Sequence, residues 1–292
     1  METNSLFKSG HTACAGCGQA IAARLVVEAA GPNTIIANNT GCLEVFSTKY
    51  PETAWGVPWI HSLFENSAAG ASGIEAALIS LGKKDGINVI AQGGDGSTGD
   101  IGLQALSGML ERGHDILYVC YDNEAYMNTG VQRSGLTPFD TNTTTSPAGK
   151  LSSGNVRPKK AVPEICLAHG IPYVATASAG FVQDLTRKVK KALSIKGPKY
   201  IQIHVPCPLG WRHESNQMLS VAKAAVETGL YPLFEYESGI LSGSRQIVPK
   251  PVEEYLKLQG RYKHLLSNPE EIKKIQEIAD NNIKKYNLRV VP

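Results

Sequence analysis

The sequence lacks an apolar run of the ~18 residues that a membrane-spanning helix needs, so no membrane partner is expected. It also lacks a strong charge bias, because 29 Lys and Arg stand against 26 Asp and Glu, for a formal net charge of +3. So weak a bias argues against nucleic acid as the main partner. Residues 1–10 carry no apolar core, so no export signal is expected and the predicted location is the cytoplasm.

The chain does have enough apolar material for a folded core, with 42% hydrophobic residues in 292. Strands that helices cover on both faces read in the sequence as short continuous apolar runs. Such runs predict strands at residues 34–38, 87–92, 115–122, 172–176 and 200–205. Helical patterns lie between them, over residues 21–29, 74–81, 103–110 and 181–193. This alternation predicts an α/β fold with a parallel sheet and helices on both faces. In the second helix, the expected apolar face is Ile74, Ala77, Leu78 and Leu81.

Two regions depart from this alternation of predicted strands and helices. Residues 132–160 are rich in Thr, Ser, Pro and Gly, and they are longer than the ~12–15 residues of a passive loop, so a functional or lid-like segment is expected. Residues 215–292 show helices and extended pieces, including a charged amphipathic helix over 269–287. We therefore expect a main domain over residues 1–214 and a C-terminal arm over 215–292 that packs on it or on a partner subunit.

Polar residues follow two of the predicted strands. Asp95 lies in a Gly-Asp-Gly triplet after the second strand, and Asn123 follows the third, with 26 residues between Gly96 and Asn123. The carboxyl ends of parallel strands meet at one edge of the sheet, where ligands bind. A carboxylate and an amide oxygen there suit Mg²⁺, and the glycines permit close backbone approach. One such triplet alone is more simply a turn, but the pair at this spacing favours a metal and phosphate site.

The cysteines form the second pattern. Cys14 and Cys17 form a Cys-x-x-Cys pair that opens a helix, and Cys42 and Cys207 each follow a predicted strand. Four thiolates suit either a tetrahedral Zn²⁺ or a [4Fe–4S] cluster, and the pair alone also fits a redox dithiol or two buried thiols. The two remaining cysteines, 120 and 166, lie inside apolar patterns and are expected in the core.

Together these patterns resemble the β subunit of pyruvate:ferredoxin oxidoreductase, within the 2-oxoacid:ferredoxin oxidoreductases. The resemblance runs from about His11 to Trp211. It rests on the segments HTACAGCG, NNTGCLEVFSTKYP, WIHSLFEN, GGDGSTGDIGLQALSG, YDNEAYMNTGVQRSG, TTTSPAGK and VPCPLGW. The family usually has Ala where this chain has Val205, a small departure.

The resemblance implies a thiamine-diphosphate-binding domain of the diphosphate-half type and oxidative decarboxylation of a 2-oxoacid, with coenzyme A and ferredoxin. It implies that Cys14, Cys17, Cys42 and Cys207 hold a [4Fe–4S] cluster. It implies Mg²⁺ bound by Asp95, Asn123 and the Ala125 carbonyl, with Asn128 and Phe64 near the reacting end of the cofactor. The implied cofactor-binding set is Gly41, Cys42, Phe64, Gly94, Asp95, Gly96, Asn123, Ala125 and Asn128.

The resemblance also implies partners, because a thiamine enzyme needs a glutamate from a second domain. An α subunit is expected to supply it, with γ and δ subunits or fused equivalents completing the complex.

Pyruvate is the favoured substrate, while oxalate, phenylglyoxylate and branched-chain 2-oxoacids stay open. The rival interpretations are a non-redox thiamine decarboxylase or synthase half, which leaves the four cysteines idle, and a cluster or zinc subunit without thiamine, which leaves Asp95 and Asn123 idle.

Three single residues carry two interpretations each. His61 either approaches the substrate or is a core histidine bonded to backbone. Arg133 and Ser134 open the long loop and either face a coenzyme A phosphate or lie at the surface, as arginines usually do.

Overall fold

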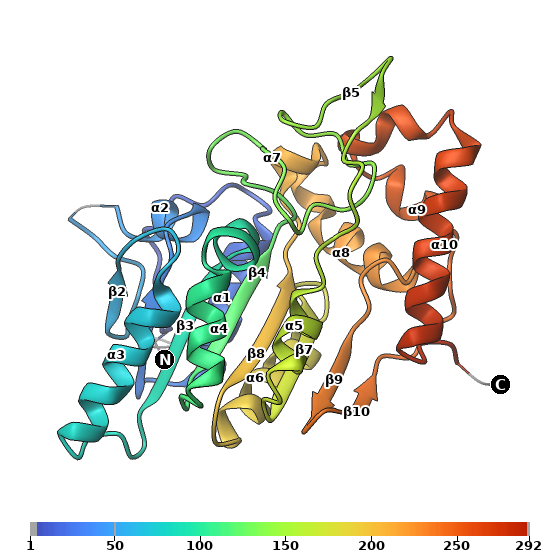
Figure 1. Cartoon of the computed structure of the whole chain (residues 1–292). Helices are drawn as coiled ribbons and strands as arrows, with labels where there is room; N and C mark the ends of the chain where they lie inside the picture. Colours follow the sequence, from blue (N-terminus) through green and yellow to red (C-terminus); the bar gives the residue numbers. More distant parts are fainter. Residues whose placement is uncertain (1–4, 50, 291–292) are drawn as a thin grey trace.

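The computed structural model describes residues 5–49 and 51–290, and its centre is an eight-stranded sheet (Figure 1). The strand order is β10 (Ile240–Ser244), β9 (Phe234–Glu237), β7 (Tyr173–Ser178), β8 (Lys199–His204), β4 (Leu117–Asp122), β3 (Asn88–Gly94), β1 (Thr34–Asn38) and β2 (Trp59–His61). From β7 to β2 all neighbours are parallel, and β9 pairs antiparallel with β7 and with β10. The five predicted strands are confirmed to within two residues, whereas β2, β9 and β10 were not predicted.

Helices cover both faces of this sheet, as expected. One face packs against α1 (Gly18–Ala30) and α6 (Val182–Ser194). The other packs against α3 (Ser67–Ser80), α4 (Leu103–Glu111) and α5 (Val162–Ala168), drawn in front of the sheet in Figure 1. Side chains of β4 alternate between the two clusters, with Val119 on the first face and Cys120 on the second. This double burial explains why the strands read as continuous apolar runs.

The predicted apolar face of α3 is only partly correct, because Ile74 and Leu78 pack against the core whereas Ala77 and Leu81 do not. Leu81 is 67% exposed, Ala77 is exposed, and Ile74 and Leu78 are only half-buried. Small residues allow α3 to lie close to the sheet, and the Glu75 carboxylate is buried because it accepts hydrogen bonds from the Asp115 N–H and the His114 ring. The buried set is Ser67, Ala68, Ala71, Ser72 and Glu75.

The long segment 132–160 packs over the carboxyl ends of the strands, where it lies above the sheet in Figure 1. It contains a short hairpin of β5 (Ala148–Gly149) and β6 (Ser152–Ser153). Hydrogen bonds within the segment hold much of it in place. For example, the Asn155 amide donates to the Thr137 and Pro138 carbonyls at 2.8 and 3.1 Å. The segment is therefore an ordered wall around the strand ends.

The chain after β8 builds a third hydrophobic cluster at the β9 side of the sheet (Figure 1). It comprises α7 (Pro208–Trp211), η2 (Ser215–Gln217), α8 (Met218–Glu227), α9 (Glu253–Leu256), η3 (Gly260–Leu265) and α10 (Pro269–Lys285). The predicted helix over 269–287 is confirmed as α10. None of the helices in the two described ranges combines the length and the apolarity needed to cross a membrane.

Candidate functional site

Four neighbouring strands, β8, β4, β3 and β1, end at one edge of the sheet and deliver the predicted residues there. Gly94 at the end of β3 pairs with Tyr121 of β4, so Asp95 continues the chain directly beside Asp122. Cys42 and Cys207 follow β1 and β8 by a few residues. Parallel pairing thus brings the two sequence patterns to one edge.

Asp95 is the buried carboxylate of this edge, with 1% of its surface exposed. The Ser134 hydroxyl donates a short hydrogen bond to its Oδ2 atom. Burial raises the pKa of Asp95 well above its ordinary value, and the nearby charge of Asp122 raises it further. The backbone turns into a helical stretch immediately afterwards, first as η1 (Ser97–Ile101) and then as α4.

Asn123 and Ala125 face Asp95. One terminal atom of the Asn123 amide lies 3.0 Å from Asp95 Oδ1 and 2.7 Å from the Ala125 carbonyl oxygen. With nitrogen in that place, the amide donates two hydrogen bonds. With oxygen there, three oxygen atoms face one another with no donor between them, which is an arrangement that a cation stabilises. The predicted trio therefore converges on one point.

The glycines of the predicted cradle have different roles. A Cβ atom on Gly93 would lie 2.6 Å from Asn39 Nδ2, and one on Gly96 would overlap the Tyr126 ring. Packing within the protein therefore requires these two glycines, whether or not a ligand approaches their backbone. Gly94 and Gly41 are different, because nothing lies closer than 4.0 Å to a Cβ built on either. Of these four glycines, Gly94 and Gly41 therefore have open space where a side chain would lie.

Behind the trio lies a buried charge network. The Lys159 ammonium is 2.7 Å from both Asp122 and Glu124, and Arg261 is 2.6 Å from Glu124. Burial tends to raise the pKa of Glu124, but Lys159 and Arg261 outweigh it and the pKa is lowered. Together with Asp95, three carboxylates stand against two cations. When Asp95 is ionised this is an excess of negative charge, which a bound cation would neutralise, so such a cation would favour the ionised form of Asp95.

The four predicted cysteines gather at the same edge. Cys17 caps α1, and the Gly18 N–H donates to the Pro206 carbonyl at 3.1 Å, which joins the Cys-x-x-Cys loop to the segment that carries Cys207. Cys42 begins α2 (Cys42–Ser47) and Cys207 caps α7. Burial raises the pKa of the Cys42 thiol to about 12, and Cys207, Cys17, Asp95 and Cys14 add to the shift. Burial likewise raises the pKa of Cys207 to about 11, with Cys17 and Cys14 contributing.

Within the described part of the chain, no group of three or more His, Cys, Asp or Glu side chains has the arrangement of a metal-binding site. The four thiols are close enough for their charges to interact, but they are not arranged as ligands of one metal or cluster. Cys120 and Cys166 are fully buried in the cluster beneath α4 and α5, which confirms the prediction that they belong to the core.

The remaining predicted residues lie around this edge. The Phe64 ring stacks on Tyr126 at 5.9 Å between centroids, and Asn128 is exposed beyond Ala125. His61 is exposed and bonds the Thr40 hydroxyl at 2.7 Å, so its interpretation as a core histidine is wrong. Ser134 is fully buried against Asp95, so the expectation that it faces a coenzyme A phosphate is also wrong. Arg133, which was expected at the surface by default, is half-buried, and its Nε–H donates to Asn155 Oδ1 at 3.2 Å.

Sequence reasoning missed the residues that hold the Asn123 loop. Glu124 and Trp211 lie inside two of the segments that carry the family resemblance, but no pattern in the neighbouring sequence indicates that they hold the Asn123 loop. Lys159 and Arg261 come from the long loop and the C-terminal arm, 35 and 137 residues after Glu124. No local pattern could assign them, because the contacts form only when distant segments pack.

The family model described as "Thiamine pyrophosphate enzyme, C-terminal TPP binding domain" matches residues 39–203. The "Pyruvate synthase subunit PorB" of Methanosarcina barkeri is 61% identical over 96% of both chains, and that of Methanocaldococcus jannaschii is 57% identical over 95% of both. The "Ketoisovalerate oxidoreductase subunit VorB" of Pyrococcus abyssi is 49% identical over 91% of this chain and 88% of its own.

Among solved structures, a chain of the 2-oxoglutarate:ferredoxin oxidoreductase from Magnetococcus marinus aligns with a TM-score of 0.58 at 22% identity. The alignment covers 76% of this chain and 81% of that chain. At this identity the likeness concerns the fold, and it matches the mostly parallel sheet described above.

Proposed function

The chain belongs to the family of the pyruvate synthase subunits PorB, thiamine-diphosphate-dependent 2-oxoacid oxidoreductase subunits, and we propose that it forms the diphosphate-binding half of a pyruvate:ferredoxin oxidoreductase. Pyruvate is the proposed 2-oxoacid because the PorB relatives are 61% and 57% identical, whereas the VorB relative is 49% identical. A branched-chain 2-oxoacid is the second candidate substrate, because the VorB relative, a ketoisovalerate oxidoreductase subunit, is also similar, at 49% identity.

The observation that carries this proposal is the convergence of Asp95, Asn123 and Ala125. Magnesium binds oxygen at about 2.0–2.1 Å in an octahedron, so neighbouring ligand oxygens lie about 2.8–3.0 Å apart. The Asn123 amide atom lies 3.0 Å from Asp95 Oδ1 and 2.7 Å from the Ala125 oxygen, which is close to that spacing. We propose that these three groups bind Mg²⁺ and that the ion holds the diphosphate of the cofactor.

The residues around the ion complete the proposed cofactor site. Gly41 and Gly94 leave backbone open for the diphosphate, and Ser134 orients Asp95. Phe64 presents an aromatic face at the same edge, where it stacks on Tyr126, and Asn128 is exposed three residues after Ala125. When bound, thiamine diphosphate supplies the decarboxylation chemistry and passes on electrons. The chain itself anchors and orients it through the ion, and the proposed set stays Gly41, Cys42, Phe64, Gly94, Asp95, Gly96, Asn123, Ala125 and Asn128.

We further propose that Cys14, Cys17, Cys42 and Cys207 hold a [4Fe–4S] cluster. The support is electrostatic: the other three thiols add to the raised pKa of Cys42, and burial makes the anionic forms of Cys42 and Cys207 costly unless iron binds them. Asp95 also contributes to the raised pKa of Cys42, so the cluster would lie beside the cofactor. Such a position suits an electron acceptor.

The proposed assembly places partners on the open edge. Three large apolar side chains there are exposed, Ile60 by 52%, Leu63 by 60% and Leu209 by 73%, and they flank Phe64 and Cys207. We propose that an α subunit covers them and supplies the activating glutamate, and that γ and δ subunits or fused equivalents, ferredoxin and coenzyme A complete the system. Residues 215–292 are proposed to be an arm of the main domain.

Anaerobic purification of the complex tests the proposal. The complex should contain thiamine diphosphate, Mg²⁺ and the iron of the cluster, and it should oxidise pyruvate faster than 2-ketoisovalerate. The isolated chain should bind thiamine diphosphate weakly, because half of the site is missing, and addition of the α subunit should restore binding. Zinc in place of iron would contradict the cluster, and full activity of the isolated chain would contradict the half-site.

A further inference from the structure

Glu124 lies between two of the proposed ion ligands, Asn123 and Ala125, in an unusual backbone conformation. Its φ angle is +68°, in the left-handed region that residues other than glycine seldom adopt. The chain reverses there, and the reversal brings the Ala125 carbonyl oxygen to 2.7 Å from the Asn123 amide. The convergence of these two groups therefore depends on whatever holds Glu124 in place.

Four contacts hold Glu124. Its N–H donates to Asp122 Oδ1 at 3.2 Å, and its carbonyl accepts from the Thr137 hydroxyl at 2.7 Å. Its carboxylate pairs with Lys159 at 2.7 Å and with Arg261 at 2.6 Å. Both backbone groups and both carboxylate oxygens are thus bonded, and only 3% of the residue is exposed.

Arg261 reaches the same loop from η3 in the C-terminal arm. Its Nη2 atom donates to Glu124, while its Nε atom donates to Gln259 Oε1 at 2.8 Å. Its guanidinium lies 3.7 Å from the centre of the Trp211 ring, and the Trp211 Nε1–H donates to the Asn123 carbonyl at 2.8 Å. Arg261 is therefore connected to both residues of the Asn123–Glu124 pair, to one directly and to the other through Trp211.

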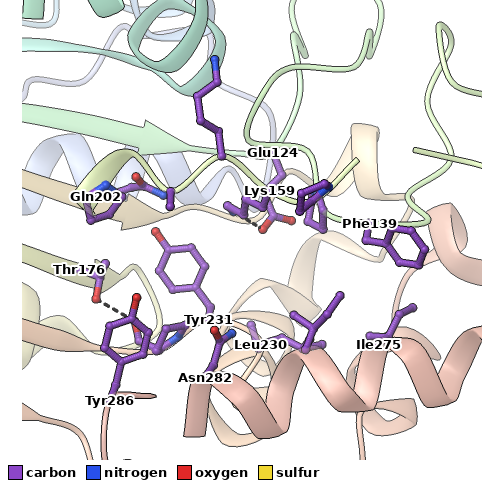
Figure 2. Close-up of a pocket in the computed structure, with 18 of the residues that line it drawn as sticks. Glu124, Phe139, Lys159, Thr176, Gln202, Leu230, Tyr231, Ile275, Asn282 and Tyr286 are labelled. Carbon is purple, nitrogen blue, oxygen red and sulfur yellow. Dashed lines mark hydrogen bonds and ion pairs between the residues drawn. The ribbon is translucent and has the colours of Figure 1, made fainter. Parts of the chain in front are cut away.

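Lys159 has a different role. Figure 2 shows it beside Glu124 at the wall of a cavity of about 260 Å³, next to Tyr231. Its side chain is 24% exposed, whereas that of Arg261 is 2% exposed. An ammonium is a point charge that neutralises the carboxylates, whereas a stacked guanidinium with directed N–H groups fixes their direction. Arg261 is thus the group that sets the geometry of the loop.

We propose that Arg261 is a positioning residue of the cofactor site, acting through Glu124 and Trp211 to hold Asn123 and Ala125 in place for the Mg²⁺–diphosphate unit. This inference rests on the proposed function of Asp95, Asn123 and Ala125. It makes the C-terminal arm part of the cofactor-binding machinery as well as a packing element.

The test measures Mg²⁺ dependence rather than activity. Equilibrium dialysis of thiamine diphosphate against the anaerobically purified complex, stripped of cofactor, gives the Mg²⁺ concentration for half-maximal binding. Arg261→Gln should raise this concentration about 10–100-fold, as loss of a residue that orients a ligand usually does. Arg261→Lys keeps the charge but loses the planar group, so it should fall between Arg261→Gln and the wild type. Iron content should not change in either variant.

Two controls separate positioning from general stability. Arg245 is another arm arginine that stacks on an aromatic ring, with its guanidinium 4.1 Å from the centre of Phe181, but it does not touch the Asn123 loop. Arg245→Gln should leave the Mg²⁺ requirement unchanged. Ile283 packs in the arm cluster away from the loop, so Ile283→Val should lower the unfolding temperature without changing the requirement.

The outcomes distinguish the two proposals. If Asp95→Asn abolishes cofactor binding while Arg261→Gln keeps the wild-type Mg²⁺ requirement, the positioning role is wrong and the ion site stands. If Asp95→Asn keeps the wild-type requirement, the ion site itself is wrong. If the Arg261 variants do not fold, Trp211→Phe replaces them, because it removes the N–H bond to Asn123 while keeping a ring under Arg261. An unchanged requirement in Trp211→Phe would overturn the inference.

Discussion

The Cys42 thiol lies within the electrostatic reach of the Asp95 carboxylate. Burial is the main reason for the raised pKa of Cys42, and Asp95 adds to it together with Cys207 and Cys17. Cys42 follows β1 and Asp95 follows β3, which are neighbours in the sheet. The residues proposed to hold the cluster and those proposed to hold the cofactor are therefore adjacent parts of one edge, and variants can separate them.

Asp95→Asn is expected to abolish Mg²⁺-dependent cofactor binding while iron stays. The Mg²⁺ concentration for half-maximal binding should rise by at least about 100-fold, because a charged ligand is lost. The unfolding temperature without Mg²⁺ should not fall, since burial already disfavours the charged form of Asp95 and raises its pKa. Dialysis, iron analysis and thermal unfolding measure the three results.

The matched control is Asp115→Asn at the opposite end of the sheet. Asp115 precedes β4, and its carboxylate pairs with Lys199 at 2.6 Å. This variant should lose stability and bind cofactor normally. Loss of cofactor binding in both variants would contradict a specific role for Asp95.

Cys17→Ser is expected to remove about four iron atoms per copy of the chain, since loss of one ligand releases a [4Fe–4S] cluster. Cofactor binding should persist and ferredoxin reduction should collapse, because the electrons lose their first acceptor. Cys166→Ala is the control: this thiol is fully buried in the core, so the variant should keep its iron and lose about 1 kcal/mol of unfolding free energy. A folded Cys17→Ser complex that reduces ferredoxin at the wild-type rate would contradict the role of the cluster.

Alanine at Gly94 and at Gly96 should give opposite results. A Cβ on Gly94 meets no atom closer than 4.0 Å, whereas one on Gly96 overlaps the Tyr126 ring. Gly94→Ala should fold with a wild-type unfolding temperature and bind thiamine diphosphate about tenfold more weakly, because the methyl group would occupy space proposed for the diphosphate. Gly96→Ala should lower the unfolding temperature even without cofactor. Wild-type cofactor affinity in Gly94→Ala would show that this backbone does not face the ligand.

Glu235 should make stability depend on pH at the β7–β9 junction. Its carboxylate is 2.5 Å from Arg187 and accepts from the Tyr173 hydroxyl at 2.7 Å. Burial alone would raise the pKa of Glu235, but these hydrogen bonds outweigh it and lower the pKa to about 2. Because the folded pKa lies below the ordinary value of 4.5, this stabilisation is present above that value and is lost as pH falls towards 2.

Glu235→Gln should therefore lower the unfolding free energy at neutral pH by about 1–2 kcal/mol, since solvent screens the half-exposed Arg187, and flatten its pH dependence below about pH 5. Urea unfolding across that range measures the effect. Glu237→Gln is the control, since its carboxylate is 43% exposed and its pair with Lys191 is worth about 1 kcal/mol or less. Equal slopes for wild type and Glu235→Gln would contradict the assignment.

Local patterns in the sequence predicted five of the eight strands of the main sheet and the polar strand ends. A strand buried on both faces is a short apolar run whatever lies beside it, and Asp95 and Asn123 follow two such runs directly. Parallel pairing then brings them together without further information, because the carboxyl ends of parallel strands share one edge. The helix α3 shows the limit of such patterns. Its apolar side chains predicted only part of the packed face, because small residues and the buried Glu75 make up its most buried positions.

The sequence by itself determined which residues are proposed to carry the chemistry, since Asp95, Asn123 and the four cysteines stand in motifs whose spacing is set by single elements and their loops. Only the tertiary structure decided how they are held. Ser134 reaches Asp95 across 39 residues and Arg261 reaches Glu124 across 137. Such contacts leave no local signal, because any charged or hydroxyl side chain at those positions looks like a surface residue until the loop and the arm fold over the sheet. Burial then makes each pairing obligatory, since an unpaired charge inside the protein is far more costly than one in water.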